Sequence, residues 1–148
     1  MVTKIIGGAA NDRVVPRVRV ETPCRSTESL AKVKLALLQL FPDLRFERED
    51  ELVVGTTEHL DRLRDLIRNQ KIRDTARGQF LKGRNADRTR VSLSKQAAYM
   101  GRVNFAAPSP LGVLVVEIED ADLASVIDYV AESTIEPEVK RSDRSGGT

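Results

Sequence analysis

The stretch VLVVEI, residues 113–118, is a dense apolar run that predicts a strand in the centre of a sheet. Asp120 follows this run and can cap the helix that begins beyond it. That helix has one apolar face, formed by Leu123, Val126, Ile127 and Val130. The sequence therefore predicts a central strand that leads into an amphipathic helix.

The remaining predicted strands precede this central strand. Alternation around Val18 and Val20 predicts the first of them. The predicted ranges are 14–22, 44–48, 52–56, 89–93 and 102–105. Between 94 and 100 the chain is predicted to form a short turn or a single helical turn, which interrupts the sheet.

Three further helices are predicted between these strands. The first, at 26–41, can be capped by Ser26 or Thr27, and the second can be capped by Thr57. The third, at 72–81, places Phe80 on an apolar stripe and hence in the core. The element order lacks regular alternation of strands and helices, so it predicts an α+β fold. In this fold an antiparallel or mixed sheet has helices packed on one face, and a dimer partner or a ligand could use the other face.

The length of 148 residues predicts one domain, and its composition of 41% apolar and 31% charged residues is typical of a soluble globular protein. We predict a flexible lead at 1–13, a single α+β domain at 14–131 and a flexible charged tail at 132–148. No apolar run approaches the roughly 20 residues of a membrane helix. A single cysteine excludes an internal disulfide, which favours a cytoplasmic location.

The net charge of +2 hides an uneven distribution along the chain. The segment 71–105 holds only two acids, Asp74 and Asp87, and carries +7, whereas the rest of the chain carries −5. Its basic residues are Lys71, Arg73, Arg77, Lys82, Arg84, Arg88, Arg90, Lys95 and Arg102. Such a segment favours a polyanionic partner. The alternative is a solvated basic surface balanced by acids elsewhere in the fold.

Two parts of this basic segment can contact RNA. Arg73 and Arg77 stand four positions apart on one helix face, where two guanidinium groups can bind phosphate oxygens. In the interruption at 94–100, Lys95 can contact phosphate, the Gln96 amide can bind base edges and the Tyr99 ring can stack on a base. The predicted RNA-binding residues are Arg73, Arg77, Lys82, Arg84, Arg88, Arg90, Lys95, Gln96, Tyr99 and Arg102.

Structural roles remain open for several of these residues. Arg77 can instead pair with a carboxylate of the core or of a partner subunit, whereas Arg73 is expected to be free. Tyr99 can belong to the core, and Gln96 can satisfy backbone groups where the sheet breaks. Lys95 is expected to be exposed there, so its loss should change stability by less than about 0.5 kcal/mol.

Catalytic and metal-binding patterns are not found in the sequence. His59 and Cys24 are each the only residue of their type, so the usual zinc ligand sets cannot be assembled. No glycine-rich phosphate loop is present. Acidic groups at 47–51 and 117–122 fall at predicted turns and caps, and a third interpretation uses carboxylates and a divalent ion for hydrolysis. We predict that the protein is not an enzyme and uses no cofactor or metal.

Several short motifs carry a family resemblance. They are LFPD at 40–43, IRDTAR at 72–77, LSKQAAY at 93–99, GRVNF at 101–105 and LG at 111–112. Together they resemble an archaeal family of small uncharacterised proteins described as RNA-binding and exosome-associated, over about 14–131. The family usually has Asn at the position of Ser94, which leaves an amide-based role there without support.

This resemblance implies an α+β fold similar to that of the ribosomal protein that binds the small rRNA of the large subunit, often as a homodimer. No catalytic residues are carried over. The first hypothesis is a cytoplasmic, homodimeric RNA-binding module without catalytic activity that uses a basic stripe at 71–105. The alternative is an interaction protein whose dimer or assembly surface is its main function. Neither hypothesis involves a membrane.

Overall fold

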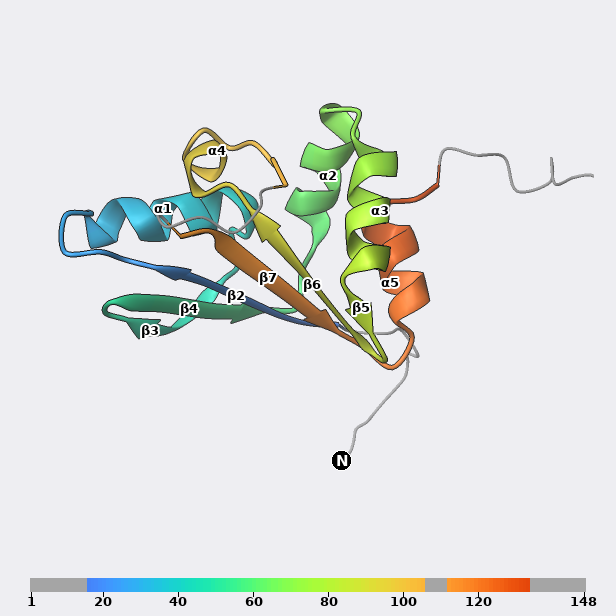
Figure 1. The fold of residues 1–148 in the computed structure, drawn as a ribbon, viewed down its shortest axis with the longest axis horizontal. Helices are drawn as coiled ribbons and strands as arrows, with labels where there is room; N and C mark the ends of the chain where they lie inside the picture. The colour runs from blue at the N-terminus through green and yellow to red at the C-terminus, as the bar shows by residue number, and fades with distance from the viewer. Residues whose placement is uncertain (1–15, 106–111, 134–148) are drawn as a thin grey trace, which may run out of the picture.

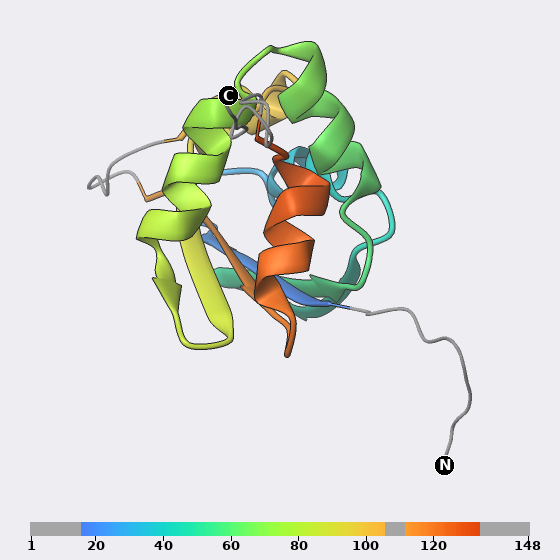
Figure 2. The same cartoon turned by 90° about the vertical axis from the view of Figure 1, so that its right-hand side faces the viewer.

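The computed structural model describes residues 16–105 and 112–133, which form one antiparallel sheet of six strands with five helices on one face (Figures 1 and 2). The predicted α+β class and the one-sided packing of helices are confirmed. The predicted flexible segment 1–13 and nearly all of the predicted tail 132–148 lie outside the described residues. No helix in the described part of the chain has the length and apolarity to cross a membrane.

The predicted central strand is confirmed as β7 (Leu114–Glu119), which lies between β2 (Arg17–Pro23) and β6 (Arg88–Leu93). On the far side of β2 the sheet continues with β4 (Leu52–Thr57) and then β3 (Arg45–Glu49). The two-residue strand β5 (Arg84–Asn85) pairs with β6 at the opposite edge. All neighbouring strands are antiparallel, so the sheet is antiparallel throughout the described residues.

The prediction of a strand at 102–105 is wrong. Among the described residues, a single bridge between Leu93 and Phe105 joins this segment to the sheet. Gly101 turns the chain with a φ of 70°, a conformation that glycine adopts without strain. The Gln70 side chain then binds both backbone groups of Val103, each at 2.8 Å. A side-chain amide therefore takes the place of a strand partner.

The helices are α1 (Leu30–Leu40), α2 (Asp61–Asn69), α3 (Arg73–Lys82), α4 (Lys95–Tyr99) and α5 (Leu123–Val130). Three predicted caps are wrong. Ser29 rather than Ser26 or Thr27 caps α1, because the chain first makes a turn in which the Glu28 N–H donates to the Arg25 carbonyl.

The other two misplaced caps also lie before the true helix start. Thr57 remains in β4 and accepts a bond from the His59 N–H, while α2 starts after Leu60. Asp122 rather than Asp120 caps α5, and the Asp120 carboxylate accepts from the Asp122 N–H. In each case a turn separates the strand from its helix.

The core lies between the sheet and the helices and is mostly aliphatic. Alternate residues of the central strands point into it, among them Val20 and Val116, which are both fully buried. Phe80 on α3 is 1% exposed, as predicted, and packs edge to face on Phe105 with ring centroids 6.2 Å apart. The Thr89 hydroxyl of β6 donates to the Phe80 carbonyl at 2.5 Å, which fixes α3 on the sheet.

Candidate nucleic-acid interface

The side of the sheet opposite the helices carries a charged surface, which we call the open face. Since neighbouring residues of a strand point to opposite sides, the residues that alternate with the core-facing ones form this face, and one of them, Val54, is only 4% exposed. Its members are Arg17, Arg19 and Glu21 of β2, Arg45, Glu47 and Arg48 of β3, Leu52, Val54 and Thr56 of β4, Arg88, Arg90 and Ser92 of β6, and Val115, Glu117 and Glu119 of β7. Arginine and glutamate dominate it, and it includes no lysine.

Strand register aligns five of these residues into one row across the sheet, which we call the central row. Arg45 lies opposite Thr56, and Thr56 lies opposite Arg19. Arg19 lies opposite Glu117, which in turn lies opposite Arg90. Four interstrand steps of about 4.8 Å place the backbones of Arg45 and Arg90 about 19 Å apart. The row thus has an arginine at each end and hydrogen-bonding groups between them.

The two terminal arginines of the central row keep an uncompensated charge. Within residues 16–105 and 112–133, neither the Arg45 nor the Arg90 side chain forms an ion pair, and both residues are exposed. Arg19, in the middle of the row, pairs with Glu21 on its own strand. The positive potential of the row is therefore concentrated at its two ends.

A second row, Arg17–Glu119–Arg88, lies beside the central row. The Arg17 guanidinium is 3.0 Å from the Glu119 carboxylate, and Arg88 approaches Glu119 at 3.6 Å and Glu117 at 3.8 Å. Two cations share one close carboxylate, so this row is only partly neutralised. A hollow of about 380 Å³ opens over β2, β3, β4 and β7, and its lining includes Arg17, Arg19, Arg45, Glu117 and Glu119.

The predicted RNA-binding residues do not gather on one surface. Only Arg88 and Arg90 lie on the open face. Exposed Lys82 is the last residue of α3, and exposed Arg84 belongs to β5, where its side chain donates to the Ala86 carbonyl at 3.1 Å. Beyond the other end of β6, exposed Gln96 belongs to α4, and exposed Arg102 follows this helix. The length of β6 separates these two groups.

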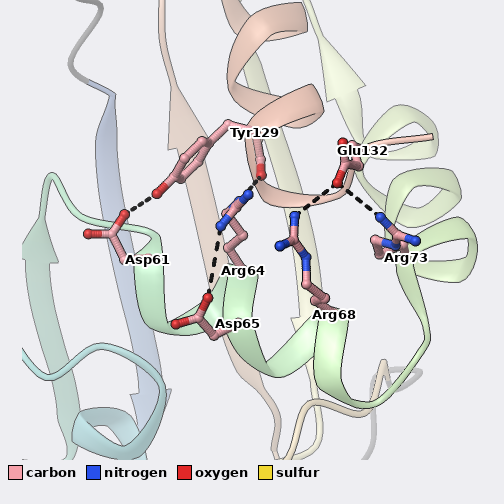
Figure 3. A network of polar contacts seen from close by, with 7 residues as sticks. All are labelled: Asp61, Arg64, Asp65, Arg68, Arg73, Tyr129 and Glu132. Atoms are coloured by element: carbon pink, nitrogen blue, oxygen red, sulfur yellow. Dashed lines mark hydrogen bonds and ion pairs between the residues drawn. The ribbon is translucent and has the colours of Figure 1, made fainter. Parts of the chain in front are cut away.

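Arg73 and Arg77 join α3 to the end of α5. Arg73 donates to the Glu132 carboxylate at 2.9 Å, so the expectation that it is free is wrong (Figure 3). Arg77 donates to the Asp128 carboxylate at 2.5 Å and to the Ala131 carbonyl at 3.3 Å. Arg77 therefore pairs with a carboxylate, as its structural alternative proposed, although Asp128 is an exposed residue of α5 and not part of the core. Helix packing brings the acids and carbonyls at the end of α5 next to α3.

The same network includes α2. Arg68 also donates to Glu132 at 2.9 Å, and Arg64 lies over the Tyr129 ring at 4.9 Å while donating to the Tyr129 carbonyl (Figure 3). The Tyr129 hydroxyl donates to Asp61, and this bond, together with partial burial, raises the pKa of Tyr129. These arginines hold three helices together, which engages much of their positive charge.

Lys95 is buried, which contradicts the prediction that it is exposed. It is 7% exposed, and its Nζ donates to the Pro23 carbonyl at 2.7 Å and to the Glu28 carboxylate at 2.9 and 3.1 Å. Packing of α4 against α1 brings this ammonium group onto the turn before α1. Burial raises the pKa of Glu28, but the Arg25 backbone N–H and Lys95 outweigh it, so the pKa is lowered overall.

Tyr99 packs partly against the core, as its structural alternative proposed. Burial, reinforced by the Glu28 charge, raises the pKa of its hydroxyl. Within the described residues, no cluster of three histidine, cysteine or carboxylate side chains could hold a metal ion. The polar side chains of the open face are guanidinium, carboxylate and hydroxyl groups.

Sequence reasoning missed most of the open face because it followed local charge density. Arg17, Arg19 and Arg45 lie outside the segment 71–105, as do Glu117 and Glu119. A signal for the β2 and β7 residues was present in the sequences RVRVE and VEIE, where charged and apolar residues alternate. This alternation places the charged residues opposite the core.

Comparison with known proteins extends this description. A family model described as RNA binding matches residues 17–132. The UPF0201 protein of Methanothermobacter thermautotrophicus is 40% identical over 126 residues, which are 82% of this chain and 96% of the relative. The chain belongs to the UPF0201 family. The family resemblance predicted from the motifs is thereby confirmed.

Solved structures of UPF0201 proteins share the fold. One is 36% identical, with a TM-score of 0.75, and the match covers 80% of this chain and 94% of the other. The UPF0201 protein of Methanococcus jannaschii is 32% identical, with a TM-score of 0.72 and coverage of 80% and 95%. The likeness to a ribosomal protein stays a prediction. The match to the RNA-binding family model spans both the open face and the helices.

Proposed function

We propose that the protein is a non-catalytic RNA-binding module and that its open face is the RNA-contacting surface. The family match over residues 17–132 supports RNA as the ligand. The observation that supports the open face is the central row, whose terminal residues Arg45 and Arg90 are exposed and form no ion pair within the described residues. The basic stripe at 71–105 is replaced in this proposal by a surface assembled from several strands.

Arginine suits this role because its planar guanidinium can donate two parallel hydrogen bonds to one phosphate. Arg45 and Arg90 offer that capacity directly. Arg17 and Arg88 share the Glu119 carboxylate, so each keeps part of its capacity to donate hydrogen bonds to phosphate. Binding through such groups releases counterions, so the affinity should fall steeply as salt is added.

A homodimer or a protein assembly is the second candidate function. The uncovered side of the sheet is one place predicted for a dimer partner, but arginine and glutamate dominate the open face. The exposed large hydrophobic residues lie elsewhere, and Met100 at the end of α4 and Leu35 on α1 are 76% and 52% exposed. These two side chains favour a protein contact on the helix side, which would leave the open face available to RNA.

The test measures RNA affinity against salt concentration for two double variants. Arg45→Ala with Arg90→Ala removes the ends of the central row, and Lys82→Ala with Arg102→Ala removes the same charge away from the open face. The first variant should lower the slope of log affinity against log salt by about 0.7–0.9 for each phosphate that the protein no longer neutralises. The control should retain most of both slope and affinity.

Two results would overturn the proposal. Absence of RNA binding by the unmodified protein at low salt would remove RNA as the ligand and favour the assembly function. An equal loss of affinity in both double variants would remove the open face as the binding surface.

A further inference from the structure

We infer that the open face recognises double-stranded RNA across its minor groove, with carboxylates in the middle of the face that accept hydrogen bonds from ribose 2′-hydroxyls. This inference rests on the proposed RNA binding and names the class of RNA. It is carried by three features of the open face: its aromatic content, the position of its carboxylates and the position of its uncompensated arginines.

The first feature is that the open face has no aromatic side chain. The chain contains four phenylalanines, two tyrosines and no tryptophan, and all six are described. Each lies in the core, against it or on α5; they are Phe41, Phe46, Phe80, Phe105, Tyr99 and Tyr129. Proteins that bind single-stranded RNA stack its bases on aromatic side chains. A surface without them suits bases that are already stacked and paired in a duplex.

The second feature is the position of the carboxylates. Glu117 and Glu119 belong to β7, which has three strands on one side of it and two on the other. A carboxylate repels phosphate and accepts hydrogen bonds, so its ligand must present donors at this place. The A-form minor groove is wide and shallow and displays 2′-hydroxyl donors between two phosphate backbones. Glu117 and Glu119 match the floor of this groove rather than its rims.

The third feature is the position of the uncompensated arginines. Arg45 and Arg90 stand on either side of Glu117 in the central row, with backbones about 19 Å apart. Uncompensated cations stand at the two ends, and between them lie the Thr56 hydroxyl, Arg19, which is paired with Glu21, and the Glu117 carboxylate. This arrangement repeats the order phosphate, 2′-hydroxyl, phosphate that a duplex presents across its minor groove. Thr56 adds a hydroxyl within the same row, where it donates to Glu47 at 3.1 Å.

The open face is also held in place before any ligand arrives. Arg17 and Arg88 bind Glu119 from both sides, and Arg88 approaches Glu117 at 3.8 Å. The underlying strands are paired with their neighbours, so little ordering is required on binding. The longer distance from Arg88 leaves Glu117 with the greater unused capacity to accept a hydrogen bond.

The experiment compares fluorescence anisotropy for an RNA duplex, a DNA duplex of the same sequence and the single RNA strand, all at one salt concentration. The RNA duplex should bind at least about tenfold more tightly than either of the others, since DNA lacks the 2′-hydroxyl. Glu117→Ala removes both an acceptor and a repulsive charge. It should tighten DNA binding and reduce the preference for RNA over DNA.

Asp65→Ala is the matched control, because it removes one exposed carboxylate from α2, on the helix side of the sheet. It should leave the RNA-to-DNA ratio unchanged, and thermal melting should show that both variants are folded. Equal affinity for RNA and DNA duplexes, or a ratio that Glu117→Ala does not move, would overturn the inference.

Preference for the single strand would also overturn the inference, while leaving the proposed RNA binding in place if Arg45 and Arg90 are still required. Absence of binding to every RNA would overturn both proposals. A preference for duplex RNA that survives Asp65→Ala and is reduced by Glu117→Ala supports both.

Discussion

Arginines on the two sides of the sheet differ in what their guanidinium groups contact. On the helix side, Arg68 and Arg73 converge on Glu132, and Arg77 binds Asp128 and a carbonyl of the same segment. On the open face, Arg45 and Arg90 meet no carboxylate within the described residues. Charge density along a sequence therefore does not identify a binding surface, because packing determines which charges are already engaged.

Lys95 and Arg90 show the same contrast, although they are only five positions apart in the sequence. Lys95 is 7% exposed and donates three hydrogen bonds, whereas the Arg90 side chain is exposed at the end of the central row. A buried cation requires its partners, so changing it acts on folding. Under the proposed function, changing the exposed Arg90 acts on RNA binding, so variants on the two sides of the sheet test this distinction.

The largest expected effect tests how strongly the helix side stabilises the fold. Phe80→Ala should reduce the free energy of unfolding by about 3–5 kcal/mol, because it opens a cavity next to Phe105. Urea denaturation measures the loss. The neighbouring Leu81, which is 47% exposed, provides the control, and Leu81→Ala should cost far less. Equal losses in the two variants would contradict the position of Phe80 in the core.

The next effect tests the buried ion pair. Lys95→Ala should cost about 1–3 kcal/mol, because it removes the ammonium donor from the Pro23 carbonyl and from the Glu28 carboxylate. RNA affinity per folded molecule should stay unchanged. Gln96→Ala, at the exposed neighbouring position, should leave the melting temperature nearly unchanged. A Lys95→Ala variant with wild-type stability and weakened RNA binding would return Lys95 to the binding surface.

A smaller effect follows from the lowered pKa of Glu28 and appears only in acid. The folded state favours the charged carboxylate, so protonation favours the unfolded state. The stability that this carboxylate contributes is fully present above its ordinary pKa of 4.5 and is lost as pH falls through the lowered value. The stability difference between wild type and Glu28→Gln should therefore shrink below pH 4.5. A difference that grows in acid would contradict the Lys95–Glu28 pairing.

The smallest effect on stability is expected on the open face. Arg90→Ala should change the free energy of unfolding by less than about 0.5 kcal/mol, yet weaken RNA binding. Arg77→Ala should cost up to about 1 kcal/mol, because it releases the end of α5, and should leave RNA binding intact. Chemical denaturation and a salt titration of RNA binding, carried out on both variants, measure the contrast. If Arg77→Ala weakened RNA binding and Arg90→Ala did not, the helix side rather than the open face would be the RNA-binding surface.

Much of the fold follows from local patterns in the amino-acid sequence. Apolar alternation predicted β2, and the apolar run VLVVEI predicted a central strand. Helical spacing placed Phe80 in the core, and short motifs identified the family. These features are local, because a strand repeats every two residues and a helix every 3.6, so side-chain orientation relative to the core can be read from one segment.

Tertiary packing, in contrast, determines which charged groups meet. Lys95 and Glu28 lie 67 positions apart, and the central row draws its five residues from five strands. Alternation of polar and apolar residues shows which side of a strand is polar, but it does not show which strands lie beside it. A slip of one residue in strand register would reverse the faces. Whether a charge is buried, paired or exposed depends on that register and on helix packing, which a linear sequence does not show.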